Sequence, residues 1–163
     1  MKKCALFLIL SLLLTGCGGM QQLETLGQIS CMEEDLPPQR RILLQLPEDA
    51  ALSTLCQGAD QLYECNGYMV LVQILPGGNV AGSIQTVCGM AAEQLTVLQS
   101  RCGDHARLDW VWTAVGEGGD VMCRAAILDD GLYHYSLQVL APAEQAGEFS
   151  DDWNRLFQSF CLE

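Results

Sequence analysis

The sequence predicts an α+β domain, an α/β/α sandwich in which two helices flank an antiparallel meander sheet. Period-two runs between residues 95 and 140, separated by Gly- and Asp-rich turns, predict four consecutive strands. The central strands are apolar on both faces, so both faces need a covering layer. Two segments with helical periodicity, at about 80–92 and after Pro142, can supply those layers.

The N-terminal segment predicts a secretory signal over residues 1–16. Lys2 and Lys3 precede an apolar run from Ala5 to Leu14 that is too short to span a bilayer. The run ends in Leu14, Thr15, Gly16 and Cys17, which resemble the lipobox of bacterial lipoproteins. That resemblance implies a diacylglyceryl or other acyl lipid on the Cys17 thiol and cleavage just before it.

A lipid on Cys17 predicts attachment to the lipid bilayer at the extracytoplasmic face of the cell membrane. Each buried methylene of an acyl chain contributes about 0.8 kcal/mol, so two or three chains hold a soluble domain at a membrane. An ordinary cleaved signal with an unrelated Cys17, or an uncleaved anchor, is the alternative.

Residues 17–39 are predicted to form a flexible tether behind the lipidated Cys17. They contain Gly18-Gly19, an acidic cluster at 33–35 and Pro37-Pro38, with no sustained apolar period. A flexible chain of that length reaches roughly 25 Å. A short amphipathic helix through Leu23, Leu26 and Ile29 is the alternative. Residues 40–163 are long enough for a single globular domain.

The first part of this domain predicts strands. Ile42 to Leu46 forms a strand ended by Pro47, and a shorter extended piece runs from Leu52 to Cys56. Residues 62–65 and 68–75 flank Asn66-Gly67, a strong hairpin signal in which both central residues tolerate positive φ.

Asn79 is placed to cap a helix over about 80–92, because Val80, Ile84, Val87, Cys88 and Ala91 recur at helical spacing. Four strands follow at 95–101, 105–115, 121–129 and 132–140. A C-terminal helix starts after Pro142, with one apolar face made of Phe149, Trp153, Leu156, Phe157, Phe160 and Cys161.

Two-residue turns at Gly118-Gly119 and Asp130-Gly131 place Trp110 opposite Ile127, and Ile127 opposite His134. One face of the sheet then holds Trp110, Trp112, Cys123, Ala125, Ile127 and His134. The other face holds Val111, Ala126, Leu128, Tyr133, Tyr135 and Leu137. We expect the aromatic side chains, with Tyr68, to be core, and a ligand groove is the alternative.

The order of early strands, one helix, a four-stranded meander and a terminal helix ending in Phe157-Gln158-Ser159-Phe160 resembles the PsbP/DcrB-like fold. The resemblance covers about residues 40–163. It implies a binding or assembly module rather than an enzyme, and it maps no catalytic residue onto this chain.

Charge excludes some partners and chemistries. Removal of residues 1–16 leaves six arginines against twenty acidic residues, a formal charge of −14, which repels nucleic acid. The mature chain has no lysine for a Schiff base or a P-loop contact. The sequence also lacks a nucleophile elbow, a zinc-protease helix and a dinucleotide fingerprint.

Weaker motifs favour structural roles. His134 and Ser136 lie two residues apart on one strand face, and Asp104 adjoins His105, so the residue types of a Ser-His-Asp set are present. We expect no such triad, because the serine does not lie on an exposed strained turn. Residues 116–119 predict a hairpin tip rather than a phosphate cradle. Asp129-Asp130 and Asp151-Asp152 predict a turn and a solvated helix face rather than calcium sites.

The mature chain is unusually rich in cysteine. An exported protein normally oxidises its thiols, so Cys56, Cys65, Cys88, Cys102, Cys123 and Cys161 are disulfide candidates, with fifteen possible connectivities. Cys31 in the tether is the candidate for the unpaired thiol. Burial alone accounts for Cys88 and Cys123 equally well. We expect no metal, and Cys123 with His134 is the weak alternative.

The sequence therefore predicts a membrane-anchored, non-enzymatic module that needs no cofactor and binds a protein or small-molecule partner. The alternative is a thiol-based redox or metal-handling protein that uses the mature-chain cysteines.

Overall fold

The structure is a computed structural model that describes residues 37–54 and 60–163. The described residues belong to one compact unit, Pro37–Glu163, which begins three residues before the predicted start of the domain. The signal segment with Cys17, the tether up to residue 36, and Cys56 lie outside the described residues.

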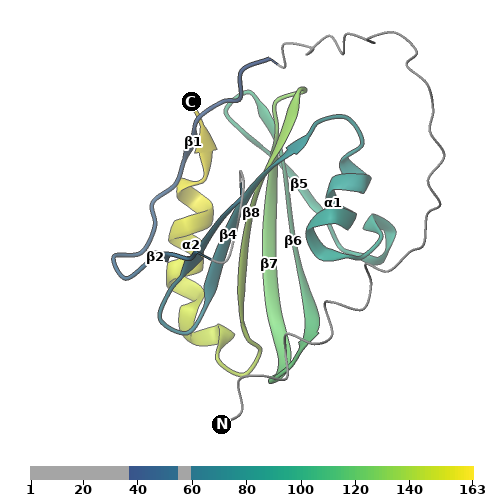
Figure 1. Cartoon of the computed structure of the whole chain (residues 1–163). Coiled ribbons are helices and arrows are strands. Elements are labelled where there is room, and N and C mark those ends of the chain that lie inside the picture. Colours follow the sequence, from purple (N-terminus) through teal and green to yellow (C-terminus); the bar gives the residue numbers. More distant parts are fainter. Residues whose placement is uncertain (1–36, 55–59) are drawn as a thin grey trace, which may run out of the picture. The chain divides into compact units, whose positions relative to one another are not determined.

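The core of the fold is a seven-stranded antiparallel sheet in the order β2-β3-β4-β8-β7-β6-β5 (Figure 1). Its C-terminal half is the predicted meander, and β8 then pairs with β4. The strands are β2 (Ala51–Leu52), β3 (Gln61–Glu64), β4 (Met69–Pro76), β5 (Leu98–Cys102), β6 (His105–Gly116), β7 (Gly119–Asp129) and β8 (Tyr133–Pro142).

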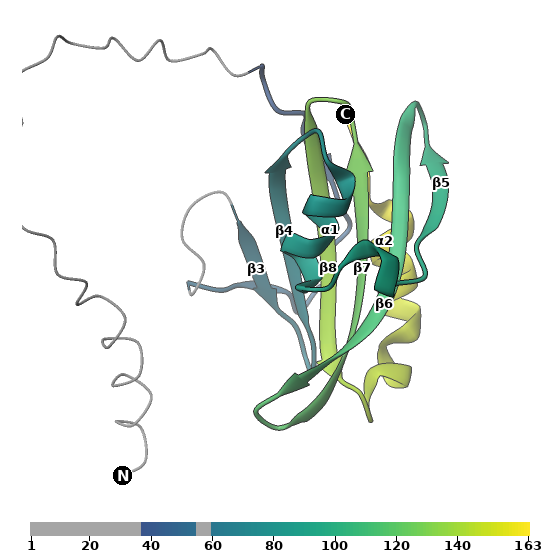
Figure 2. The ribbon, with the colours of Figure 1, turned by 90° about the vertical axis from the view of Figure 1, so that its right-hand side faces the viewer.

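Two helices cover opposite faces of this sheet, α1 (Val80–Cys88) on one side and α2 (Ser150–Ser159) on the other (Figure 2). Ile84 of α1 packs into a cluster with Trp110, Trp112 and Ile127. Trp153, Leu156 and Phe157 of α2 join the larger cluster on the opposite face. The predicted α+β sandwich is confirmed.

Helix α1 begins as predicted but ends earlier. The Asn79 side chain accepts a hydrogen bond from the Ala81 amide and so caps the first turn. Gly89, with a φ of 73°, adopts the left-handed conformation and ends the helix at Cys88 rather than at residue 92. A short 3₁₀ turn, η3 (Ala92–Gln94), follows.

The C-terminal helix differs from the prediction at both ends. Pro142 ends β8, and a 3₁₀ turn, η4 (Ala146–Phe149), precedes α2, which starts at Ser150. Phe160 has an extended backbone, so Cys161 lies in β9 (Cys161–Leu162) and not on the helix. β9 pairs with β1 (Ile42–Leu43), which is shorter than the predicted 42–46 strand.

The early hairpin is confirmed, with a different turn geometry. Glu64 pairs with Met69 around Asn66-Gly67. Gly67 has a φ of 91°, whereas Asn66 does not adopt positive φ. Phe149 packs over this turn so closely that a Cβ atom at Gly67 would lie 2.6 Å from the Phe149 ring. The turn therefore depends on glycine at position 67.

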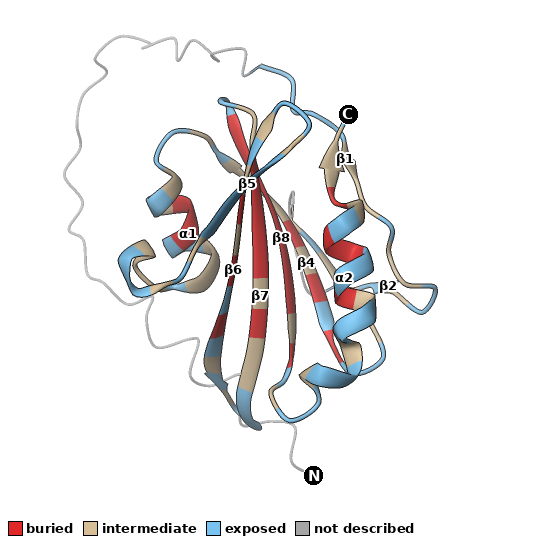
Figure 3. Ribbon diagram, turned by 180° about the vertical axis from the view of Figure 1, so that it is seen from behind, coloured by how far each residue is buried: buried red, intermediate tan, exposed pale blue. Residues whose placement is uncertain are grey.

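The predicted register of the meander is wrong by two residues, although the faces are correct. Trp110 pairs with Ala125 because the β6–β7 turn is centred on Glu117-Gly118, and Ile127 pairs with Ser136 because the β7–β8 turn is centred on Gly131-Leu132. A shift of two keeps every side chain on its face. Much of the central strands is buried (Figure 3), and the five aromatic side chains expected in the core are buried. Val111, which was expected on the apolar face opposite the tryptophans, is 60% exposed.

Gly77, in the link from β4 to α1, provides a test of this packing. A Cβ atom there would lie 2.5 Å from the Leu132 carbonyl oxygen. We expect Gly77→Ala to lower the free energy of unfolding by about 1–3 kcal/mol in urea denaturation. Gly147→Ala is the control, because its methyl group would meet no atom within 4 Å. Equal stability of the two variants would contradict the close approach at Gly77.

Candidate functional site

A cavity of about 490 Å³ lies at the end of the sheet where the β3–β4 and β6–β7 turns meet the last residues of β8. The β3–β4 turn contributes Cys65, Gly67 and Tyr68, and the β6–β7 turn contributes residues 116–120. The volume is within the range of small-molecule sites. The prediction of a hairpin tip at 116–119 is confirmed, and the cavity beside it was not predicted.

The cavity has apolar walls and an acidic rim. Met69, Val121, Leu140 and Pro142 are among its lining residues. The titratable carboxylates around it are Glu64, Glu117 and Asp120, and no lysine, arginine or histidine of residues 37–54 and 60–163 lines it. Such a lining suits an apolar group joined to a neutral or positively charged group, and it disfavours an anion.

The cavity contains one thiol, that of Cys65. Burial raises the pKa of Cys65, and the negative charge of Asp49 raises it further. At neutral pH the group is therefore a thiol, the less nucleophilic form. Among the described residues that line the cavity, none is a histidine that could act as its base. Cys65 is therefore a weak nucleophile in this setting.

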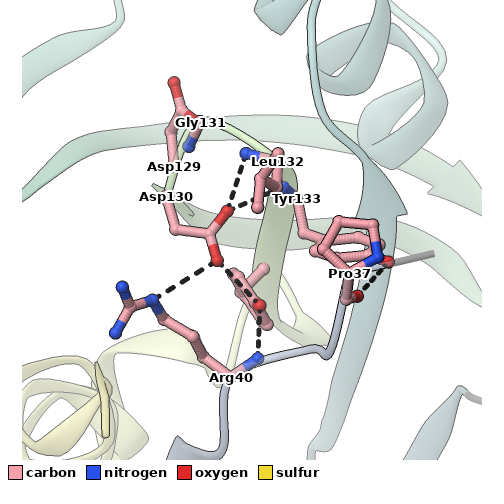
Figure 4. Close-up of polar contacts among 8 residues, drawn as sticks. Pro37, Arg40, Asp129, Asp130, Gly131, Leu132 and Tyr133 are labelled. Atoms are coloured by element: carbon pink, nitrogen blue, oxygen red, sulfur yellow. Dashed lines mark hydrogen bonds and ion pairs between the residues drawn. The ribbon is translucent and has the colours of Figure 1, made fainter. Parts of the chain in front are cut away.

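The opposite end of the sheet holds a polar network centred on the Asp130 carboxylate (Figure 4). Its Oδ1 atom accepts hydrogen bonds from the amides of Leu132 and Tyr133, at 2.9 and 2.7 Å. Its Oδ2 atom accepts one from the Tyr135 hydroxyl and lies 3.6 Å from Nε of Arg40. The β7–β8 turn lies at residues 130–132, one residue later than the predicted 129–131, because Asp129 still pairs with His134, and Asp130 stabilises the turn through these bonds.

This network holds the first described residues of the chain. The Arg40 amide donates to the Tyr135 hydroxyl at 2.7 Å, and the Tyr133 hydroxyl donates to the Pro37 carbonyl at 2.8 Å (Figure 4). The segment 37–40 is therefore fixed at the β7–β8 turn. β8 runs from this network to the cavity, and its ten residues span about 30 Å.

A second polar chain was not predicted. The Ser83 hydroxyl of α1 and Nδ1 of His134 share a 2.7 Å hydrogen bond, and Nε2 of His134 lies 3.6 Å from Oδ1 of Asp129. The order resembles a catalytic triad, but the His134 side chain is fully buried and Ser83 is 7% exposed. A substrate cannot reach the hydroxyl without displacement of α1, so the chain links α1 to the sheet.

The residues that the sequence suggested for chemistry are not brought together. Ser136 is buried beside Gln138, and His134 uses Ser83 in its place. Cys123 pairs with Leu140, six positions from His134 along β8, a separation of about 20 Å. Among the described residues, no group of three His, Cys, Asp or Glu side chains can hold a metal ion.

The five described disulfide candidates, Cys65, Cys88, Cys102, Cys123 and Cys161, are free thiols in the structure. Cys123 is 1% exposed, and its burial raises the pKa of its thiol to about 11. Cys88 donates to the Ile84 carbonyl within α1. The interpretation as a buried core residue is confirmed for Cys123, whereas Cys88 is only partly buried against the same cluster.

Comparison with known proteins gives a likeness of fold. No protein family model and no curated protein sequence matches the chain. LpqN of Mycobacterium tuberculosis, described as involved in cell envelope biogenesis, superposes with a TM-score of 0.52 at 12% identity, over 79% of this chain and 87% of LpqN. A Pseudomonas aeruginosa protein of unknown function, PA94, superposes with a TM-score of 0.49 at 13% identity, over 78% of this chain and 86% of PA94.

The LpqN likeness supports the α+β architecture found here, in a chain whose sequence is very different. The predicted resemblance to the PsbP/DcrB-like fold stays a prediction. Over residues 37–54 and 60–163, neither helix is long and apolar enough to cross a membrane.

Asp130→Asn tests the network at the β7–β8 turn. Burial tends to raise the pKa of Asp130, but hydrogen bonds from Tyr133, Leu132 and Tyr135 and the charge of Arg40 outweigh it, so the pKa is lowered. A carboxyl whose pKa is lower in the folded state stabilises the fold above its unfolded pKa. That contribution is lost as pH falls below about 4.

We therefore expect Asp130→Asn to lower the unfolding free energy by about 1–3 kcal/mol at pH 7. The difference from the wild type should shrink below about pH 4, when the wild-type carboxyl takes up its proton. Urea denaturation between pH 3 and 7 measures both effects. Glu117→Gln, an exposed change at the β6–β7 turn, is the control. A pH-independent difference would argue against the ionised carboxylate as the cause.

Proposed function

We propose that this protein is a lipid-anchored, extracytoplasmic, non-enzymatic binding module whose ligand site is the 490 Å³ cavity. One observation carries the proposal. The cavity opens at one end of β8, while the segment 37–40, which continues into the tether, is fixed at the other end about 30 Å away. The point at which the chain enters the domain and the cavity are thus at opposite ends of β8.

The lining supports a binding role and suggests the ligand class. Apolar walls and carboxylates without basic groups favour an apolar or aromatic body that carries a cationic group. The ligand can be a small molecule or a side chain of a partner protein. The raised pKa of Cys65 and the burial of His134 support binding without covalent chemistry.

The location rests on the N-terminal segment. Leu14 to Cys17 match the lipobox pattern, and the acylated Cys17 would hold the chain at the bilayer. The fold of LpqN, which is described as involved in cell envelope biogenesis, is compatible with an envelope role for this chain. Fold alone is weak evidence for function, so both parts of the proposal need direct tests.

The intact mass of the protein from native membranes tests the anchor. We expect a chain that starts at Cys17 and carries a diacylglyceryl group, because the lipobox directs both reactions. Cys17→Ser should abolish the lipid mass and leave the signal segment in place, whereas Cys31→Ser should change neither. An unmodified chain cleaved elsewhere would rule out lipid anchoring.

Matched probes test the cavity. The full chain is labelled with ¹³C-methyl methionine and placed in phosphatidylcholine nanodiscs. We expect 4-phenylbutylamine to shift the NMR signal of the Met69 methyl group, and the shift should saturate as the amine concentration rises. 4-Phenylbutyrate, which reverses the charge, should bind about fivefold or more weakly beside the acidic rim. Met90 packs in the α1 cluster, so its signal is an internal control.

A variant that neutralises two carboxylates of the acidic rim tests whether charge causes this difference between the probes. Glu117→Gln with Asp120→Asn should weaken the amine by about fivefold and leave the carboxylate probe unchanged or stronger. Met69→Leu assigns the signal. If neither probe moves the Met69 signal, or if both move Met69 and Met90 alike, the cavity is not the ligand site.

A further inference from the structure

Two thiols that are far apart in sequence lie around one cavity. Cys102 ends β5 and Cys161 begins β9, and both line a polar cavity of about 330 Å³. Arg40 and the turn residues 103–105 complete most of its wall. The cavity therefore lies between the β5–β6 hairpin and the β1–β9 pair, at the end of the chain marked C in Figure 1.

One contact limits the distance between the two cysteines. The Cys102 thiol lies 3.8 Å from the Phe160 carbonyl oxygen, and Phe160 directly precedes Cys161. Because a carbonyl oxygen lies about 2.8 Å from the next Cα atom, the Cys102 sulfur is at most about 6.6 Å from the Cα of Cys161. Side-chain rotation with a small backbone adjustment at the chain end can cover the remaining gap.

We propose that Cys102 and Cys161 are a redox pair that closes to a disulfide in the exported protein. Each thiol loses a proton, and the two sulfur atoms together lose two electrons as the S–S bond forms. The oxidant is a second disulfide of the glutathione or protein type. It accepts the two electrons through a mixed disulfide and leaves as two thiols.

The other described cysteines are less suited to this reaction. Cys123 is buried in the core against α1, and the Cys88 thiol is hydrogen-bonded within that helix. Cys65 lies in the β3–β4 turn beside the other cavity, away from both Cys102 and Cys161. Cys102 and Cys161 are partly exposed and line a surface cavity, so an oxidant can reach them.

The bond would join elements that are otherwise connected weakly. β1 and β9 form a two-stranded sheet of their own, separate from the seven-stranded sheet. A Cys102–Cys161 bridge would tie this sheet to the β5–β6 hairpin and close a long chain segment that contains β6 to α2. Loops of this size gain much from closure.

Peptide mapping of the full chain in detergent tests the pair. Trypsin cuts after Arg101, Arg107 and Arg155, so Cys102 and Cys161 fall in separate peptides, 102–107 and 156–163. After equilibration with oxidised glutathione and alkylation without reductant, we expect these two peptides to be recovered as one linked species. Reduction should release them.

Stability provides the second measurement. Reduction should lower the melting temperature of the wild type by on the order of 10 °C. It should have no such effect on Cys102→Ser or Cys161→Ser, whereas Cys65→Ser should behave as the wild type. Recovery of both peptides as alkylated thiols from oxidised, folded protein would overturn the proposal. So would a bridge from either cysteine to another partner, or retention of a zinc ion by the two thiols.

Discussion

The rest of the structure depends on one constraint, the apolar character of both faces of the central strands. Ala126 and Leu128 of β7 face α2, while Ala125 and Ile127 of the same strand face α1, and all four are fully buried. An antiparallel sheet with this pattern cannot leave one face in water. The position of each helix, the burial of the tryptophans and tyrosines, and the three-layer architecture all follow from it.

Because the core fills both faces of the sheet, the two ends of the strands are the places left for function. At one end, the buried Asp130 carboxylate accepts hydrogen bonds from two amides and a hydroxyl and forms an ion pair with a guanidinium. These interactions fix the segment that enters the domain. At the other end, glycine-rich turns of small side chains leave an open cavity. The same strands that carry the core thus set the distance between attachment and cavity.

Local signals predicted most of the fold, and distant contacts account for what was missed. Asn79 and Asn66-Gly67 act within a few residues, so the start of α1 and the hairpin were predictable. The two predicted registers of the meander are each wrong by two residues, because the β6–β7 turn is centred one residue earlier than predicted and the β7–β8 turn one residue later. Three glycines at 116–119 allow several positions for the first of these turns. The Arg40–Asp130 ion pair and the cavity could not be predicted, since each joins segments that only the folded sheet brings together. Ser83 was missed because a helix face turned toward a histidine has no sequence signature.

The polar chain through His134 lies in the packed interior between α1 and the sheet. The Ser83 hydroxyl shares a hydrogen bond with Nδ1 of His134, whereas Nε2 makes no hydrogen bond and lies 3.6 Å from Oδ1 of Asp129. The same arrangement on a surface could activate a hydroxyl, but here the His134 side chain is fully buried. Burial thus makes the group a link between α1 and the sheet. The proposed redox pair differs in this respect, because Cys102 and Cys161 are partly exposed and line one cavity.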